Sequence, residues 1–316
     1  MRCSECEHNF VVDPKWLGGW HDGNAACPAC GVTCEQSEAP RVIVNPGDVA
    51  LHDEFVTQLH WYHTSTQPDW PTKNFDPAAG WGPEEFSRMG GQDVVDTWVA
   101  GQRAKALHVG TYEAAIHNML RRMDDQGDRE NQFYLYRVRL RPNVRVREAW
   151  IRDPGGPWGD VPLADVCPPG VDAARYLNHH EDVGRLSLAL GRGAIASVQR
   201  LTVPQPGGGD GWERDAVEAI TRSDEAVSDL TRKPNKLGQF RGPQPGLQRI
   251  GVAAAAVLAL GEQLPLDLRC RFSDAVAISV DADPVRWARR VSELSTLILN
   301  PSTVLAALDE EELIPV

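Results

Sequence analysis

The chain has 316 residues, of which 42% are hydrophobic, enough for a sizeable core and for more than one domain. It carries 44 acidic and 32 basic residues, a net charge of -12, so bulk charge excludes a protein that coats nucleic acid or an anionic membrane, while a local basic face stays compatible. No apolar run of about 18 residues occurs, and the first residues lack a signal-peptide pattern. We therefore expect a cytoplasmic protein without a membrane segment.

The cysteines are concentrated near the start of the chain, with five of the seven in the first 34 residues. In a reducing compartment such clustering indicates metal binding rather than disulfides. Two CxxC pairs can each form a tight turn, and together they complete a closed tetrahedral site with no position for water. We predict a structural zinc site formed by Cys3, Cys6, Cys27 and Cys30, with Cys34 as an alternative to Cys30.

Residues 1–40 resemble a zinc ribbon in these two pairs. The resemblance implies a zinc ion that stabilises the segment, or a module that binds nucleic acid or protein. The segment has little to bury beyond Phe10, Trp16 and Trp20, so its folding should depend on the metal. A closed four-thiolate site is not expected to be catalytic.

An expected strand, Trp61 to Ser65, ends in polar residues and brings His63, Thr64 and Ser65 to a loop. The stretch from Pro68 to Gly91 is rich in Pro, Trp and Gly, and we expect it to be long and irregular. Long loops beside polar strand ends often cover ligands. This end of the strand is therefore a candidate binding segment.

A second candidate is the junction between a strand that starts at Ala106 and a helix from Tyr112 to Met123. Thr111 precedes the helix and is a suitable N-cap, because its hydroxyl can accept a free backbone N–H. A helix N-terminus that follows a strand also offers N–H groups to an anion.

Residues 133–141 alternate between arginines and apolar residues, the pattern of a strand with two different faces. Arg137, Arg139 and Arg141 share one face, and Arg145 and Arg147 continue the series. Two interpretations stay open for this face. It is either the solvated face of an antiparallel sheet or a surface for a phosphate-bearing partner.

The densest polar segment runs from Tyr176 to Ser187 between two strand-like runs. It holds two histidines, two carboxylates and an amide, namely His179, His180, Glu181, Asp182 and Asn178. This density is typical of a reactive site on the rim of a sheet, and a solvated hairpin is the alternative.

Taken in order, these segments resemble NAD-dependent ADP-ribosyltransferase domains, and most closely their phage-associated and toxin-like branches. The likeness lies in a strand that ends Tyr-His-Thr-Ser, in Leu-His-Val-Gly-Thr-x-x-Ala-Ala, and in Tyr-x-Asn-x-x-Glu-x-x-Gly-x-x-Ser before an Ile-x-Ser-Val strand. It covers roughly half the chain. It implies an α+β domain over residues 41–205, in which NAD, the substrate, lies in a cleft between two split antiparallel sheets.

By this resemblance, Glu181 stabilises the oxocarbenium-like ribose and His63 binds a ribose hydroxyl. Nicotinamide leaves as a neutral pyridine, so the site needs negative charge near the developing cation rather than a general acid. We expect the acceptor of the ADP-ribose to be a macromolecule, either nucleic acid or protein. The zinc ribbon and the arginine face are compatible with nucleic acid, and an acidic protein or a small molecule fits nearly as well. The residues implied in NAD binding are His63, Thr64, Ser65, His108, Thr111, Tyr112 and Asn178.

The chain departs from relatives that modify arginine, which carry a second carboxylate two residues before the key glutamate. His179 stands there instead, so arginine is disfavoured as the acceptor. The side chain that stacks on nicotinamide is also open between His108, Tyr112 and a tryptophan of residues 68–91.

Two other functions are compatible with the sequence. A degenerate domain can belong to a non-catalytic zinc-ribbon adaptor for nucleic acid or protein, which predicts no NAD binding. His60 and His63, with His179, His180 and Glu181, can instead form a His/carboxylate metal centre for hydrolysis. A strand would, however, send the side chains of His60 and His63 to opposite faces.

Residues 205–211 are rich in glycine and mark our preferred domain boundary. Residues 206–316 are predicted to form a mainly helical domain, with a strand at Ala275 to Val280 and a helix capped by Asp283 and started by Pro284. Such helices can serve oligomerisation, target docking or association with the preceding domain.

Overall fold

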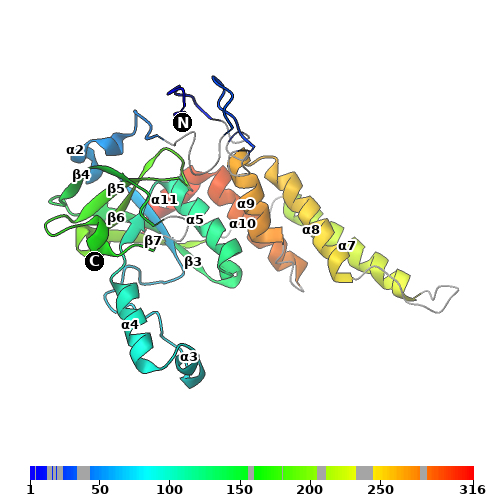
Figure 1. The fold of residues 1–316 in the computed structure, drawn as a ribbon. Coiled ribbons are helices and arrows are strands. Elements are labelled where there is room, and N and C mark those ends of the chain that lie inside the picture. The colour runs from blue at the N-terminus through cyan, green and yellow to red at the C-terminus, as the bar shows by residue number, and fades with distance from the viewer. Residues whose placement is uncertain are drawn as a thin grey trace.

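Two four-stranded sheets form the centre of the molecule in the computed structural model (Figure 1). The structure describes residues 1–3, 5–12, 16, 19, 24–33, 43–155, 160–179, 181–204, 211–232, 245–277 and 283–316. The predictions for Cys34, for His180 and for the glycine-rich residues 205–210 lie outside the described residues. The mixed α+β class predicted from the sequence is confirmed.

Sheet one is antiparallel throughout, and sheet two is antiparallel except at one edge. Sheet one has the order β1 (Trp61–Ser65), β3 (Phe133–Leu140), β7 (Ile195–Val203), β8 (Ile314–Pro315). Sheet two has the order β2 (Leu107–Val109), β6 (Leu186–Leu190), β5 (Ala173–Leu177), β4 (Val146–Arg152).

In the described part of the chain a backbone bridge joins the two sheets at a place that we call the seam. There the Tyr62 N–H donates to Gly110 O at 2.8 Å, and the Gly110 N–H donates to Tyr62 O at 3.0 Å. This bridge joins β1 to the residue that follows β2. Because Gly110 lies between β2 and the next helix, the same point also fixes where that helix begins.

The expectation of purely antiparallel sheets is wrong for β4, which pairs parallel with β5. A parallel pair requires a crossover connection rather than a tight turn. The chain between β4 and β5 makes that connection, and its described part includes the short helix α6 (Leu163–Val166). The sequence patterns of β4 and β5 do not encode the direction of pairing, because it depends on the path of this connection.

Thirteen helical segments, α-helices and 3-10 turns together, accompany the strands in the described part of the chain. They are η1 (Val49–Leu51), α2 (Asp53–Val56), α3 (Pro83–Arg88), α4 (Gln92–Arg103), α5 (Tyr112–Asp125), η2 (Asp128–Glu130), α6, η4 (Arg192–Ala194), α7 (Gly211–Arg232), α8 (Pro245–Gly261), α9 (Leu266–Ala277), α10 (Pro284–Leu299) and α11 (Pro301–Asp309).

Two large hydrophobic clusters give the molecule its layers. One lies between the sheets and includes Tyr136 and Val138 of β3. The other lies between sheet one and the helices and includes Phe133 and Leu135 of the same strand. The two-residue period of a strand explains this division, because successive side chains point to opposite faces. Sheet one is therefore covered on both faces.

The helices of residues 206–316 share their hydrophobic cluster with α5 and sheet one. Ile220 of α7, Phe272 of α9 and Leu308 of α11 are fully buried in it, beside Leu120 of α5. The end of the chain also returns to sheet one as β8, which pairs with β7. The division into residues 1–40, 41–205 and 206–316 stays a prediction. The helices that follow residue 206 pack extensively against α5 and sheet one, which precede it.

Local sequence signals account for the start of several helices. Thr111 caps α5 by accepting from the Ala114 N–H at 3.1 Å, as predicted. Asp283 caps α10 in the same way, with Pro284 in its first turn. Two expectations are wrong: α3 interrupts the loop expected at 68–91, and residues 275–277 belong to α9 rather than to a strand.

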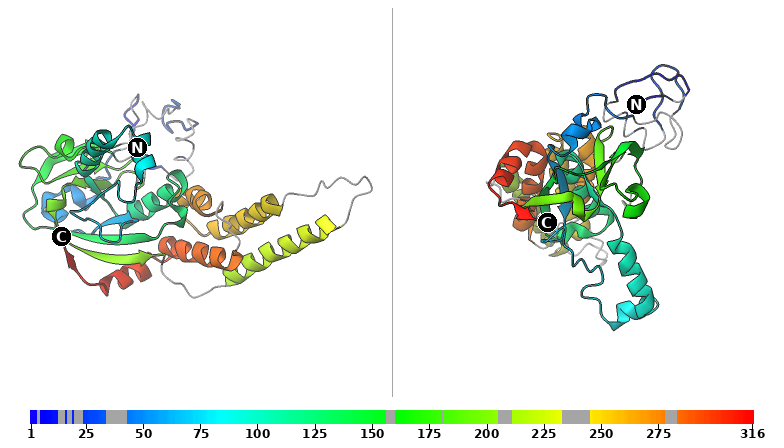
Figure 2. Two further views of the ribbon diagram at one scale, coloured as in Figure 1. Left: turned by 90° about the horizontal axis from the view of Figure 1, so that it is seen from below. Right: turned by 90° about the vertical axis from the view of Figure 1, so that its left-hand side faces the viewer.

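Two helical pairs project from the body. Helices α3 and α4 extend from the two-sheet region as an arm, and α7 and α8 extend on another side as a long pair (Figures 1 and 2). On the arm, Met89 and Val94 are exposed and the rings of Trp81 and Trp98 stack at 5.0 Å. Among the described helices none is by itself long and apolar enough to span a bilayer; α10 with α11 reaches that threshold only as a pair bent by 88°.

Candidate functional site

The four cysteines at the start of the chain form one cluster. Their Sγ atoms all lie within 4.8 Å of one another. Cys3 Sγ lies 3.7 Å from Cys30 Sγ, and Cys6 Sγ lies 3.8 Å from Cys27 Sγ. Four thiolates around zinc, with Zn–S bonds of about 2.3 Å, lie about 3.8 Å apart in a tetrahedron. The cluster can therefore bind zinc.

The same backbone turn presents both cysteine pairs. The Glu7 N–H donates to Cys3 O at 3.0 Å, and the Gly31 N–H donates to Cys27 O at 2.9 Å. The residue after the second cysteine of each pair has a positive φ, 59° at Glu7 and 72° at Gly31. Left-handed backbone is costly for a residue with a Cβ atom, so the first turn carries strain that glycine removes from the second.

The cysteine segment also packs onto the body of the protein. Ala25 is buried in the cluster between the sheets, together with Leu177 and Leu186, and Met1 and Trp16 pack against that cluster. Sheet two thus supplies apolar surface that a segment of this length cannot supply for itself. Near the cysteines, Met1 and Phe10 line a cavity together with Val183 and Gly184 of the turn between β5 and β6.

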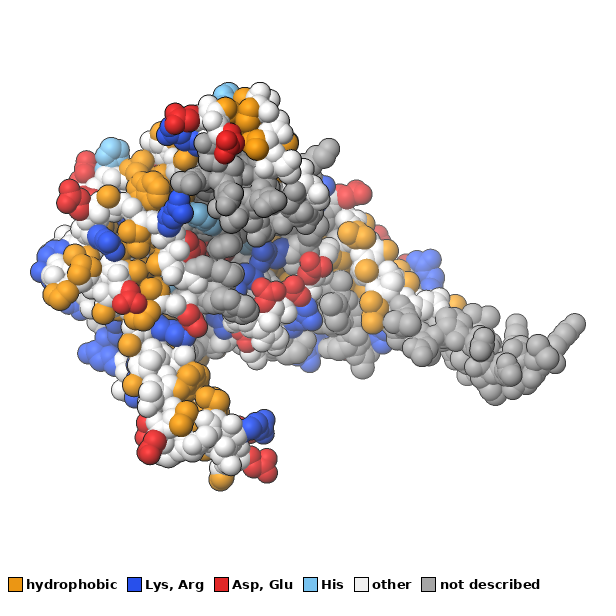
Figure 3. All heavy atoms as spheres, viewed as in Figure 1, with side chains coloured by type: hydrophobic (Ala, Val, Ile, Leu, Met, Phe, Trp, Pro, Cys, Tyr) orange, Lys and Arg blue, Asp and Glu red, His pale blue; other side chains and the backbone are white. Residues whose placement is uncertain are grey.

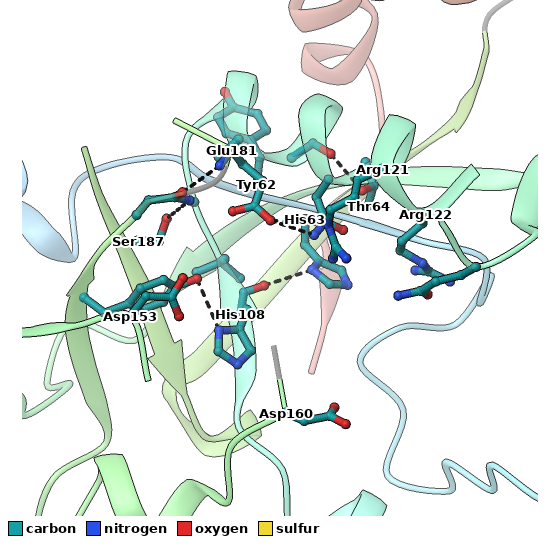
Figure 4. A pocket seen from close by; sticks show the side chains of 18 residues that line it. Tyr62, His63, Thr64, His108, Arg121, Arg122, Asp153, Asp160, Glu181 and Ser187 are labelled. Carbon is teal, nitrogen blue, oxygen red and sulfur yellow. Dashed lines mark hydrogen bonds and ion pairs between the residues drawn. The ribbon is translucent and has the colours of Figure 1, made fainter. Parts of the chain in front are cut away.

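A cavity of about 310 Å³ lies at the seam, between the two sheets and α5 (Figure 4). Its volume is at the lower end of the range for small-molecule sites. Figure 4 shows that its walls come from β1, β2, α5 and the turn after β5. The polar side chains that line it are Tyr62, His63, Thr64, His108, Asn118, Arg121, Arg122, Gln126, Asp153, Asp160, Tyr176, Asn178, Glu181 and Ser187.

His63 is held on both sides within this wall. Its ring stacks on Trp70, with 4.1 Å between ring centroids and 19° between planes. Its Nδ1 lies 2.9 Å from His108 O, and because a carbonyl only accepts, Nδ1 carries the hydrogen. Burial, with a smaller effect of the nearby Arg122 charge, lowers the pKa of His63 to about 3. His63 is therefore neutral at pH 7, with Nε2 as an acceptor.

Glu181 lies in the turn between β5 and β6, and Asn178 organises that turn. Asn178 Oδ1 accepts from the N–H groups of Glu181 at 2.8 Å and Asp182 at 3.2 Å. Its Nδ2 donates to Ser187 Oγ at 3.2 Å, and the residue is 2% exposed. The buried amide thus links both ends of the turn and sets the backbone at Glu181.

Helix α5 supplies two partners for the Glu181 carboxylate. Asn118 Nδ2 donates to Glu181 Oε1 at 3.3 Å, and Arg121 Nε lies 3.7 Å from the same oxygen. Residues three apart on a helix lie on one face, so both side chains reach the turn. The side chains of Arg121 and Glu181 are only 10% and 15% exposed. A carboxylate buried to this extent requires such partners.

A further cation comes from the C-terminal helices. Arg271 on α9 lies close enough to Asp125, Arg121 and Glu181 to interact with their charges, and burial lowers its pKa. Residues after 206 therefore contribute to the electrostatics of the seam cavity. No motif around Arg271 indicates this role, because it results from the packing of α9 on α5.

Thr111 ties the β5–β6 turn to the start of α5. Its hydroxyl donates to Asp182 Oδ2 at 2.6 Å while it accepts from the Ala114 N–H. Burial raises the pKa of Asp182, with the Thr111 hydrogen bond acting in the opposite direction. The turn that carries Glu181 is thus attached to the helix that carries Asn118.

The structure places the predicted site residues in three groups. His63, Thr64, His108, Asn178 and Glu181 line the seam cavity. Ser65 lines a neighbouring cavity. Thr111 and Tyr112 line neither, and the Tyr112 hydroxyl donates to Leu297 O of α10 at 2.8 Å. Their roles toward a ligand stay predictions.

Strand alternation explains why adjacent residues of β1 separate. Thr64 faces α5, where its hydroxyl donates to Ala115 O at 2.9 Å. His63 and Ser65 face the other side. Neither Asn118 nor Arg121 is among the predicted site residues, although their three-residue spacing on a predicted helix was available as a signal.

The five arginines predicted to share one face do not do so. Arg137 is 3% exposed, and its guanidinium binds Asp309 Oδ1 at 2.5 Å and Leu305 O at 3.0 Å, both on α11. Arg147 belongs to β4 of the other sheet. The alternation along β3 was correct, but α11 covers the face that was expected to be open.

In the described part of the chain, the cysteine cluster is the only group of three or more His, Cys, Asp or Glu side chains close enough to hold a metal ion. The proposed His/carboxylate metal centre has no support among those residues, and His180 lies outside them. Comparison with protein-family models, with curated proteins and with solved structures found no match for this chain.

Proposed function

We propose that the chain transfers ADP-ribose from NAD to a macromolecular acceptor, with Glu181 and His63 as the functional pair. In this proposal residues 41–205 form an ADP-ribosyltransferase-like domain, and the cysteine segment forms a zinc ribbon. One observation carries it. The two segments in which the family resemblance has its key histidine and glutamate are far apart in sequence, yet both line one cavity at the seam.

The reaction requires from the protein a negative charge near C1′ and a fixed orientation of the bound NAD. The bond between nicotinamide and ribose C1′ breaks, nicotinamide takes the electron pair and leaves neutral, and the acceptor attacks C1′ and releases a proton. The Glu181 carboxylate supplies negative charge near the developing cation. Asn118, Arg121 and the Asn178 turn hold that carboxylate in place, so little reorganisation is needed during the reaction.

His63 acts as a hydrogen-bond partner in this proposal and not as a proton donor. Its pKa of about 3 keeps the imidazole neutral at pH 7. With Nδ1 committed to His108 O, Nε2 is the acceptor for a ribose hydroxyl. The stack on Trp70 restricts rotation of the ring and so maintains that orientation.

The test is calorimetric titration of NAD into the zinc-loaded protein, combined with detection of released nicotinamide. We expect Glu181→Gln to bind NAD but to release nicotinamide about 10²- to 10³-fold more slowly, since one preorganised group contributes roughly 3 to 4 kcal/mol. Glu148→Gln is the matched control, because Glu148 is an exposed carboxylate on β4. Equal loss in both variants, or release unaffected by Glu181→Gln, would contradict the proposal.

One observation favours a second function. Glu181 already has an amide and a guanidinium as partners, so its burial is accounted for without a substrate. A non-catalytic zinc-ribbon adaptor built on the same fold is consistent with that arrangement. It predicts neither NAD binding nor nicotinamide release, so the same experiment separates the two functions.

A further inference from the structure

A second cavity, of about 680 Å³, adjoins the seam cavity. The two cavities share four lining residues, His63, His108, Arg122 and Asp160. A ligand in the second cavity would therefore lie across His63 from a ligand in the first. We call this second space the cationic cavity because of its charged lining.

Basic side chains outnumber acidic ones around it. Asp160 is its one acidic lining residue among those described, in a protein whose net charge is -12. Figure 3 shows Lys and Arg side chains on the body where the α3–α4 arm leaves it. A cleft of this kind concentrates anions even when the whole molecule is acidic. The basic lining residues are Lys73, Arg103, Lys105, Arg122 and Arg192.

Not all of these charges are compensated within the protein. Lys105 Nζ binds Asp160 Oδ1 at 2.6 Å, and Arg122 binds Asp128 Oδ2 at 2.6 Å. Lys73 and Arg192, by contrast, form no ion pair with the residues whose positions are described.

Arg192 is oriented by the backbone rather than by an acid. Its Nε donates to Pro71 O at 2.9 Å, which holds the stem and leaves the terminal nitrogens available to a ligand. A guanidinium presented in this way suits the oxygens of a phosphate.

The rest of the lining is apolar or uncharged. Trp70, Phe75, Leu107 and Leu163 provide apolar surface, and Gln67, Thr72 and Gln102 provide neutral donors and acceptors. Phosphate-binding cations beside apolar surface and amide groups match the parts of a nucleotide, whose base has an apolar face and a polar edge.

We propose that the cationic cavity binds a nucleotide unit of a nucleic-acid acceptor through its phosphate, held by Lys73 and Arg192. The inference rests on the proposed function and names its acceptor class. The bond from C1′ to nicotinamide breaks, a hydroxyl or ring nitrogen of the acceptor forms the new bond to C1′, and the acceptor proton passes to solvent. No further reactant is required.

The test uses the full zinc-loaded chain, NAD labelled in its adenosine half, single-stranded DNA and RNA oligonucleotides, and a mixture of unrelated proteins as competing substrates. We compare the wild type with Lys73→Glu/Arg192→Glu. The control, Arg286→Glu/Arg289→Glu, reverses two exposed charges on α10. We expect the cavity variant to label oligonucleotides at least tenfold less while its KM for NAD in nicotinamide release stays within twofold.

Binding of an unreactive fluorescent oligonucleotide gives a second measurement that does not depend on turnover. The affinity of the wild type should fall as salt rises. The slope of log K against log salt concentration should be shallower in the cavity variant, by about 0.7 for each phosphate that the variant no longer binds. The control variant should match the wild type. This binding measurement tests whether the cationic cavity binds nucleic acid even if no ADP-ribose is transferred.

The outcomes separate the two proposals. If no protein releases nicotinamide, the proposed function fails, and salt-dependent binding that disappears only in the cavity variant still supports the nucleic-acid site. If the cavity variant raises the KM for NAD, the cavity belongs to the donor and the inference is overturned. Label found only on added protein substrates, or labelling and binding equal in all variants, would overturn it as well.

Discussion

The cysteine cluster and the seam cavity differ in where their residues come from. Each cysteine pair lies in one short turn, and a backbone hydrogen bond inside that turn orients its thiolates. The cavity collects its polar groups from β1, β2, α5 and the β5–β6 turn, and it depends on the packing that brings these elements together. The first site should therefore depend on its metal, and the second on the hydrophobic core.

The two regions are also in contact. Ala25 of the cysteine segment is buried in the cluster between the sheets, and Val183, beside Glu181 in the β5–β6 turn, packs against the same cluster. Substitutions confined to one region can show whether the cysteine cluster depends on its metal and the cavity on the core despite that contact.

Loss of the metal is expected to have the largest effect. Cys27→Ser removes one of four ligands, and the zinc-binding free energy of such sites, about 10 to 16 kcal/mol, is folding free energy for the segment. Zinc content should fall below one per chain, and amide exchange should accelerate across residues 1–33. Cys167→Ser is the control, since Cys167 is buried outside the cluster. If NAD binding also disappears in Cys27→Ser, the two regions are not independent.

A substitution in the hydrophobic core should destabilise the two-sheet body and leave zinc binding unchanged. Leu188 on β6 is fully buried between the sheets, and Leu188→Ala removes apolar contacts and leaves a cavity at a cost of about 2 to 5 kcal/mol. Denaturant unfolding should show this loss. Zinc content should stay at one per chain, whereas release of zinc at the same denaturant concentration as global unfolding would show that the cluster depends on the core.

Asn178→Ala addresses the turn that carries Glu181. It removes the acceptor for two backbone N–H groups, and leaving them unpaired costs about 1 to 3 kcal/mol. We expect lower stability and a reduced kcat for nicotinamide release with a smaller change in KM, because Glu181 loses its position. Asn178→Asp keeps the acceptor and should restore part of both. A stability loss without any kinetic change would limit Asn178 to a structural role.

The smallest effect concerns pH. The folded pKa of His63 is lowered to about 3 from a reference value of 6.5, so below pH 6.5 the unfolded chain takes up a proton that the folded chain does not. Stability is therefore lost as pH falls, by about 1 kcal/mol at pH 5.5. The difference in unfolding free energy between pH 7.5 and 5.5 should shrink in His63→Gln but not in His52→Gln, whose histidine is exposed.

Several local features could be read from residue patterns alone. The turn of each CxxC pair, the Thr111 and Asp283 caps and the alternation along β3 all depend on neighbours within a few positions. Such interactions form in the same way in most contexts. For this reason spacing was sufficient to predict them.

Features that depend on distant packing could not be read in the same way. The contact of Arg137 with α11 joins residues 168 positions apart in the sequence. The hydrogen bond from Tyr112 to α10 joins residues 185 positions apart. The parallel pairing of β4 depends on the path of its connection. Asn118 and Arg121 were missed because a helix pattern shows which residues share a face but not what that face contacts.

By itself, the sequence determined the α+β class, the cysteine cluster and the segments that carry His63 and Glu181. Only the tertiary structure decided that these two residues share a cavity, that α5 holds Glu181, and that a cationic cavity lies next to it. The physical reason is range. Periodicity, caps and ligand turns are set by residues close in the chain, whereas a cavity is the space left when distant elements pack, and it has no local pattern.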